Sequence, residues 1–111
     1  MSFLSLLGER AEVYAREAGQ ERWRKVTAEA VACRVVTLSP REQEMWLGQT
    51  RAETTHRGRC LPDEQIVAGR AIVVNEERAF IVLNARPVSY PRPRGHVALD
   101  LQEVPLRSIK P

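Results

Sequence analysis

Short runs in which apolar and mostly polar residues alternate constrain this chain more than any other feature. Near the C-terminus Val97, Leu99 and Leu101 occupy every second position, and the same alternation runs over Ala11–Arg16. A period of two puts side chains on opposite faces of a β-strand, whereas a helix needs a period near 3.6. The pattern therefore predicts a chain built mainly of half-buried strands.

Turn-forming residues separate these runs and predict how they pair. Residues 70–74 and 79–83 are rich in β-branched and aromatic side chains and flank the polar turn 75–78, which predicts a hairpin. A further strand is expected over 54–61, before the turn signal Pro62-Asp63. Another is expected from Trp23 through to Val36.

The remaining segments predict connections. Gly19 marks a loop between the first two strands, and the proline-rich, basic stretch 86–95 is expected to be a loop without strand potential. The tail 105–111 is expected to be frayed or bound to a partner. The apolar lead 1–8 is too short for a stable free helix, so it either covers the domain's own core or docks on a neighbour.

One helix start stands out, at Ser39-Pro40-Arg41-Glu42, where an N-cap serine, a first-turn proline and a capping-box glutamate follow one another. Gly48 ends this helix after two turns. We therefore expect a long connection over 39–53 between strands. The fold class predicted is a single domain over 1–111: a small, mainly β, antiparallel barrel or sandwich of five to six strands spanning 10–104.

Composition narrows the class of protein. The 111 residues suit one domain, and the net charge of +3 permits contact with nucleic acid without demanding it. Fifteen arginines against two lysines are most simply the mark of a GC-rich genome. Neither a long apolar span nor a signal-peptide pattern is visible, so the expectation is a soluble protein of the cytoplasm or of an assembly, without a membrane partner.

The residues that could carry chemistry give weak signals. Cys33 and Cys60 are expected to be buried small hydrophobes, with a disulfide or metal site as the alternative. On a strand His56 would lie about 13 Å from Cys60, too far for one metal ion, so a surface or cross-strand hydrogen-bonding role is expected for it. Of the two tryptophans, Trp23 is expected in the core or at the barrel rim. Trp46 is expected either there or at a partner subunit.

Catalysis is not expected either. Ser89, His96 and Asp100 supply the residue types of a nucleophilic triad, but nothing in the sequence brings them together. Phosphate-binding loops and metal-ligand motifs are also missing from the sequence. The prediction is a protein that is not an enzyme and holds no cofactor or metal.

In their order and spacing, several segments resemble the phage head–tail joining (head closure, or stopper) family of tailed bacteriophages and gene transfer agents. The resemblance covers about 10–104. Its opening hairpin corresponds to Arg10–Tyr14, Gly19 and Trp23; its middle strand to Thr54–Arg57; and its C-terminal half to Gly69–Ile72, Phe80–Val82 and Val97–Glu103. The turn at 75–77 departs from the family, which usually places a glycine there, as does the long loop 86–95.

This resemblance implies a ring of identical subunits at the neck of a virion or gene transfer agent particle, assembled in the host cytoplasm. Its partners would be an adaptor or portal-side connector protein above, a tail terminator or tail-tube protein below, and packaged double-stranded DNA in the channel. The connection 40–53 would face that DNA. Its candidate contact residues are Arg41, Glu42, Glu44, Gln49 and Arg51.

A closed ring needs two different complementary patches on each subunit. Candidate subunit or partner contacts are Phe3, Leu4, Leu6, Leu7, Trp46, Tyr90, Arg92 and Arg94. The alternative function is a small SH3- or OB-like barrel that binds nucleic acid or a peptide as an independent module. A third, a toxin-like small β ribonuclease, lacks a catalytic constellation in the sequence.

Overall fold

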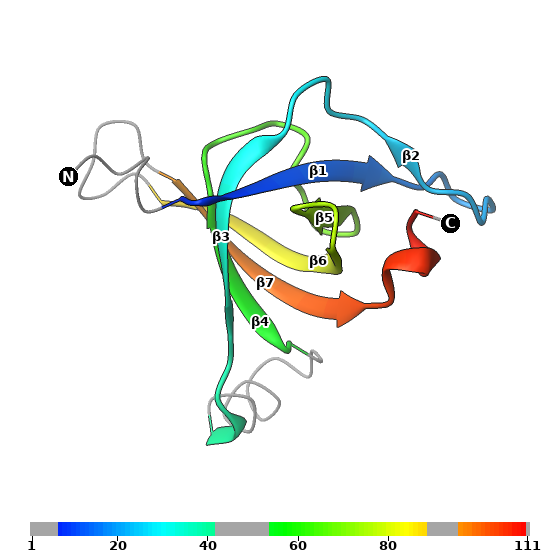
Figure 1. The fold of residues 1–111 in the computed structure, drawn as a ribbon. Helices are drawn as coiled ribbons and strands as arrows, with labels where there is room; N and C mark the ends of the chain where they lie inside the picture. Colours follow the sequence, from blue (N-terminus) through cyan, green and yellow to red (C-terminus); the bar gives the residue numbers. More distant parts are fainter. Residues whose placement is uncertain (1–6, 42–53, 89–95, 111) are drawn as a thin grey trace.

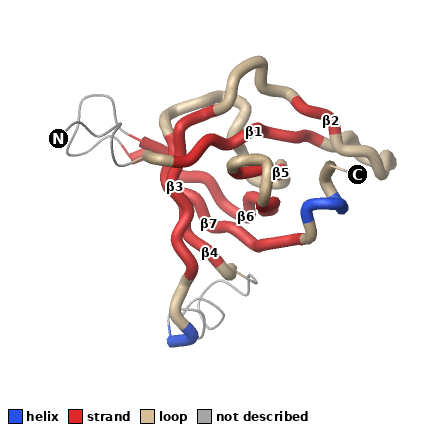
Figure 2. Tube along the Cα trace, viewed as in Figure 1, coloured by secondary structure: helices blue, strands red, loops and turns tan. Residues whose placement is uncertain are grey.

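A computed structural model describes residues 7–41, 54–88 and 96–110 of the chain (Figures 1 and 2). These residues form strands with one short 3₁₀ helix after the last of them. The elements are β1 (Glu9–Ala15), β2 (Arg24–Lys25), β3 (Val31–Thr37), β4 (His56–Cys60), β5 (Ala71–Val74), β6 (Arg78–Val88), β7 (His96–Val104) and the 3₁₀ helix η2 (Leu106–Ser108).

The strands form one antiparallel sheet that closes on itself. Their order is β2-β1-β3-β4-β7-β6-β5, and β5 pairs back with β1, for example Val13 with Ile72. The result is a closed six-stranded barrel with β2 as an extra strand beside β1. Closure leaves fewer unpaired backbone edges than an open sheet of the same strands. The predicted antiparallel barrel is confirmed.

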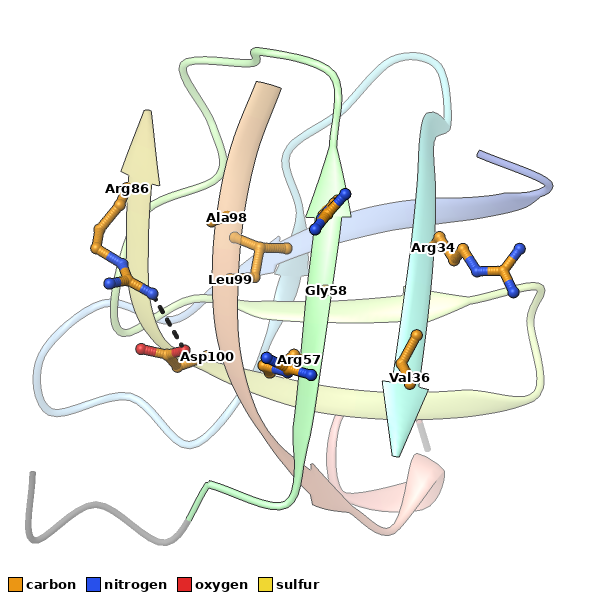
Figure 3. A pocket seen from close by; sticks show the side chains of 9 residues that line it. Arg34, Val36, Arg57, Gly58, Arg86, Ala98, Leu99 and Asp100 are labelled. Carbon is orange, nitrogen blue, oxygen red and sulfur yellow. Dashed lines mark ion pairs between the residues drawn. The ribbon is translucent and has the colours of Figure 1, made fainter. Parts of the chain in front are cut away.

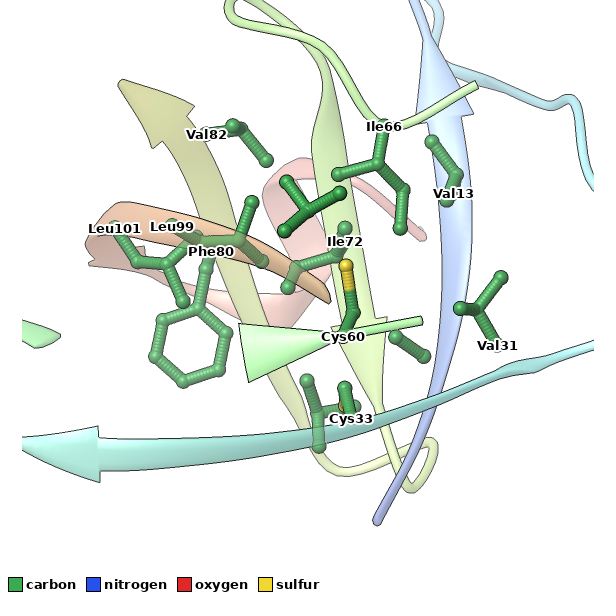
Figure 4. Packing of buried hydrophobic residues seen from close by; sticks show 13 residues of the cluster. Val13, Val31, Cys33, Cys60, Ile66, Ile72, Phe80, Val82, Leu99 and Leu101 are labelled. Carbon is green, nitrogen blue, oxygen red and sulfur yellow. The ribbon is translucent and has the colours of Figure 1, made fainter. Parts of the chain in front are cut away.

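The barrel interior holds the inward-facing side chain of nearly every second strand residue (Figure 4). On β7 the predicted alternation is confirmed, since Val97, Leu99 and Leu101 are all buried. The largest fully buried side chain is Phe80 of β6. Burial of these apolar side chains is the main favourable contribution to folding.

The hairpin β5–β6 forms as predicted, through a tight turn. Asn75 and Glu76 both have positive φ, at 51° and 58°, and the Glu77 amide donates to the Val74 carbonyl at 3.0 Å. Positive φ at both central residues suits the right-handed twist of a hairpin. Asn75 also joins the turn to β1, because its side-chain oxygen accepts from the Arg10 amide at 2.9 Å.

The strand expected over 23–36 is interrupted, so this prediction was wrong in part. β2 pairs with the end of β1, Tyr14 opposite Lys25, whereas β3 pairs with its beginning. Between β2 and β3 the chain bends, and the Thr27 hydroxyl accepts from the Val13 amide at 3.1 Å. A side chain thus takes the place of a ladder bond there.

The expectation of a loop over 86–95 was also wrong at its start. β6 continues through Val88, and Arg86, Pro87 and Val88 pair with Ala98, Val97 and His96 of β7. Along this part of β6 the structure shows no second neighbouring strand, because β5 pairs only with residues 78–81. A proline fits a strand whose other edge is open. Residues 89–95 lie outside the described residues.

The tail expected to be frayed or partner-bound packs on the barrel instead. After η2, Ile109 is 2% exposed and contacts a cluster that includes Tyr14, Ala71 and Val73. This cluster covers the outer side of β5, which explains why all four residues of β5 are buried. Trp23, expected in the core or at the barrel rim, packs partly buried against this outer cluster.

Candidate nucleic-acid interface

Four arginines line a shallow hollow of about 400 Å³ on the outside of β3, β4, β7 and β6 (Figure 3). Strand register arranges its lining in two rows across the four strands. The first row is Arg34, Arg59, Ala98 and Arg86, and the second is Val36, Arg57 and Asp100. We call this surface the arginine groove; its charged members are Arg34, Arg57, Arg59, Arg86 and Asp100.

Strand alternation explains why the arginines gather on this face. In β4 the side chains of His56 and Cys60 are buried, so Arg57 and Arg59 point outward. Gly58, between the two arginines, lies close to β7: a Cβ there would come within 3.0 Å of the Leu101 side chain. Ala98, the smallest side chain of the first row, leaves the groove concave between its longer neighbours.

Asp100 supplies the only carboxylate of the groove lining. Its side chain is 7% exposed, and its Oδ1 lies 3.6 Å from the Arg86 Nη2 (Figure 3). Within the described residues this oxygen accepts no hydrogen bond. A buried carboxylate oxygen without a donor is unfavourable, so the groove offers an acceptor as well as positive charge.

The groove's chemistry suits phosphate. Four guanidinium groups against one carboxylate leave a positive surface, and guanidinium matches the geometry of phosphate oxygens. No aromatic side chain is among its lining residues. Base stacking on aromatic rings, the usual means of holding single strands, is therefore not available in the groove. Contact with a phosphate backbone is the interaction that this surface can make.

The long connection leaves and returns at one end of the barrel. The Leu38 amide donates to the Thr55 carbonyl at 3.1 Å, so residues 39–54 are closed at their base. Figure 1 shows the short helical segment that follows β3 at this end, near the start of β4. Pro40 and Arg41 are helical and follow Ser39 directly, which confirms the predicted helix start.

A hydrogen-bond network involving His56 holds this base together. Arg78 Nη2 donates to the His56 Nε2 at 2.9 Å, which places the imidazole proton on Nδ1, 2.8 Å from the Thr55 hydroxyl. The same hydroxyl accepts from the Glu103 amide at 2.9 Å. Burial, and with it the Arg78 charge, lowers the pKa of His56, although Glu103 opposes this. His56 is thus buried, so the surface role expected as one alternative was wrong, and its hydrogen bond with Arg78 of β6 confirms the cross-strand role expected as the other.

The predicted contact residues are only partly placed by the structure. Leu7 is 4% exposed and packs on its own chain, whereas Arg41 is exposed. His96 and Asp100 lie four residues apart along β7, about 13 Å, with Asp100 paired to Arg86 instead. The other predicted contacts lie outside the described residues: Phe3, Leu4, Leu6, Glu42, Glu44, Trp46, Gln49, Arg51, Tyr90, Arg92 and Arg94.

The arginine groove was missed by sequence reasoning. From the sequence, Arg57 and Arg59 are given no role in a site, and Arg86 is placed in a loop. The spacing of Arg57 and Arg59 by two residues on a strand was the one available signal of a common face. Arg34 and Arg86 join them only through strand register.

The described ranges contain no group of three or more His, Cys, Asp or Glu side chains arranged to hold a metal ion. Nor do they contain a helix with the length and apolar character needed to cross a membrane. Comparison of the whole chain with protein-family models and with curated proteins gives no match.

Proposed function

We propose that this protein is a structural component of the head–tail junction of a tailed phage or gene transfer agent particle. Copies of the barrel would form a ring below the portal and its adaptor. The ring would close the DNA-filled head and provide the surface on which the tail docks. In this role the protein acts by steric and electrostatic contact and carries out no reaction.

The observation that carries the proposal is the long connection closed at its base. The Leu38 amide donates to the Thr55 carbonyl, and all the strands of the barrel lie outside residues 39–54, so the sheet is complete without this connection. A closed barrel with such a connection suits a subunit that packs in a ring and presents the connection to a channel. The order of elements in the resemblance to the head–tail joining family supports the same role.

The first experiment removes the gene from the strain that produces the particles. The proposal predicts heads that have lost their DNA and lack tails, and restoration of both by the wild-type gene. A second variant replaces residues 42–53 with a short Gly-Ser linker and leaves the base at Leu38 and Thr55 intact. It should still be incorporated at the neck but retain DNA poorly. Normal tailed, DNA-filled particles without the gene would overturn the proposal.

The arginine groove favours a second candidate function, a barrel that binds nucleic acid as an independent module. Contacts of the groove's arginines with phosphate would be non-specific, because the lining offers no aromatic ring for base stacking. Each phosphate contact with duplex DNA contributes about −0.9 to the slope of log K against log salt. If all four arginines take part, the slope is about −3.6, and pairing of Arg86 with Asp100 reduces it to about −2.7.

A titration of labelled duplex DNA over a salt series separates the two functions. An independent module should bind as a monomer with the slope above, and the double variant Arg57→Ala, Arg59→Ala should make that slope shallower by about 1.8. The matched control is Arg24→Ala, Arg107→Ala, which removes the same charge from exposed sites outside the groove. Weak binding that both double variants reduce equally would rule out the groove as a DNA site.

A further inference from the structure

The two cysteines lie opposite each other on neighbouring strands, although 27 positions separate them in the sequence. Cys33 of β3 is the direct register partner of Cys60 of β4. Both thiols are free, both residues are fully buried, and both belong to the barrel core (Figure 4). Two side chains at facing positions on the same side of a sheet are cross-strand neighbours in direct reach of each other.

The backbone hydrogen bonds identify which type of pair this is. The next pair along the ladder, Ala32 and Leu61, is hydrogen-bonded, since the Leu61 amide donates to the Ala32 carbonyl at 3.2 Å. The Leu38 amide donates to the Thr55 carbonyl, and Leu38 lies an even number of residues along the chain from Ala32. The pair of Leu38 and Thr55 is therefore of the same hydrogen-bonded type, in agreement with the alternation. Hydrogen-bonded and non-hydrogen-bonded pairs alternate in an antiparallel ladder. Cys33 and Cys60 are therefore a non-hydrogen-bonded pair.

This position suits a covalent bridge. The Cα atoms of a non-hydrogen-bonded pair lie about 4.5 Å apart, and their side chains approach more closely than those of the other type. Disulfides span Cα separations of about 4.4–6.8 Å. A bond between Cys33 and Cys60 thus falls at the short end of the permitted range, with both strands kept in register.

We propose that Cys33 and Cys60 form a modification site, a dithiol that a small-molecule disulfide oxidises to an intramolecular disulfide. The thiolate of one cysteine attacks the small disulfide, forms a mixed disulfide and releases one small thiol. The thiolate of the other cysteine then attacks the protein sulfur of that mixed disulfide and releases the second small thiol. Two protein thiols are oxidised and one small disulfide is reduced to two thiols.

The same burial makes the reaction slow. Burial raises the pKa of both thiols to about 12, which leaves little of the reactive thiolate, and the core keeps the oxidant out. Oxidation therefore requires β3 and β4 to separate locally, so its rate follows the frequency of that opening. Once formed, the bond lies in the closed core and resists reducing agents for the same reason.

The bond would join β3 to β4 at the end of the pair opposite the long connection, which begins after Leu38. It would hold together the two strands between which that connection leaves and returns. For the loop that a bond between Cys33 and Cys60 closes, the stabilisation corresponds to a rise in Tm of about 15 °C. The inference does not rest on the proposed function, although a particle released from a reducing cell meets the oxidising surroundings in which disulfides persist.

The test is incubation of the purified protein with oxidised glutathione, in buffer and in urea just below the unfolding transition. We expect a mass loss of two hydrogen atoms, a Cys33–Cys60 linked peptide after digestion, an unchanged β-sheet circular dichroism spectrum and the rise in Tm. The reaction should be faster in urea. Cys33→Ala and Cys60→Ala are the controls, and neither should show the mass loss or the rise in Tm.

Three results would overturn the proposal. The first is free thiols after refolding from urea with oxidised glutathione, in protein that regains its native spectrum. The second is oxidation that stops at a glutathione adduct or links two chains. The third is an intramolecular disulfide that lowers Tm or abolishes the native spectrum, because the bridge would then not fit the register of β3 and β4.

Discussion

Replacing either of two neighbouring threonines at the base of the long connection with valine should change the free energy of unfolding in opposite ways. The Thr55 hydroxyl accepts from the His56 ring at 2.8 Å and from the Glu103 amide at 2.9 Å, and it donates to the Leu101 carbonyl at 3.4 Å. The Thr54 hydroxyl is buried, and no described atom is its hydrogen-bond partner. Thr54→Val therefore removes a hydroxyl without a described hydrogen-bond partner, whereas Thr55→Val removes a hydroxyl that has three.

The expected magnitudes follow from these contacts. A polar group left without its partner in a buried position costs about 1–3 kcal/mol. Thr55→Val leaves the buried His56 ring and the more accessible Glu103 amide without an acceptor, so the free energy of unfolding should fall by about 2–3 kcal/mol. For a domain of this size that is a fall in Tm of about 10 °C. Thr54→Val removes an unpaired hydroxyl and should be neutral or stabilising by up to about 1 kcal/mol.

Thermal and urea unfolding, followed by circular dichroism, measure both variants against the wild type. An unchanged m-value would show that the folded and unfolded states keep their compactness, so that the free energies can be compared. The reasoning is refuted if the two variants lose the same stability, or if Thr54→Val is the more destabilised of the two.

Three further predictions concern other parts of the barrel. Burial lowers the pKa of His56 from 6.5, so as the pH falls the unfolded chain takes up a proton before the folded protein does. The free energy of unfolding should therefore fall as the pH drops below about 6.5. Urea unfolding at a series of pH values should show a weaker pH dependence in His56→Gln. Glu76→Gly should raise the free energy of unfolding by about 0.5–1 kcal/mol, because Glu76 has a φ of 58°, whereas Glu77→Gly should not stabilise in the same assay. Gly58→Val should lower the free energy of unfolding by about 1–3 kcal/mol, because even a Cβ would stand 3.0 Å from the buried Leu101 side chain. An unchanged free energy of unfolding would show instead that the core adjusts to the larger side chain.

The fold could be predicted largely because alternation and turn residues act locally. On β7 the alternation of Val97, Leu99 and Leu101 was enough to identify both the strand and its buried face. The helix start at Ser39 is a local signal of the same kind, and Pro40 follows it in helical conformation. β5 was also recognised, but its burial on both sides depends on the C-terminal segment that covers it.

The errors arose where a distant part of the chain decides the local structure. Pro87 was taken as the mark of a loop, yet the strand β7 pairs with the backbone around it and the open edge tolerates the proline. Ile109 was assigned to a tail that is frayed or bound to a partner, because its packing partners are far away in the sequence. In both places long-range contacts outweigh the local preference.

The candidate sites depend on register, which a single sequence does not specify across a barrel. Arg34 and Arg59 face each other only because β3 and β4 pair with Val35 opposite Gly58, and Arg86 joins them through β7. The same register brings Cys33 opposite Cys60. A shift by one residue would turn the arginines into the core, so burial of the inner face is what selects the observed pairing.

The most direct test of the proposed function is a cryo-EM reconstruction of the neck of particles that carry this protein. The proposal predicts a ring of closed barrels between the portal-side connector and the tail, with residues 39–54 of each copy directed toward the channel. Particles whose neck density is fully explained by other proteins would contradict it. So would a ring in which these connections point away from the DNA.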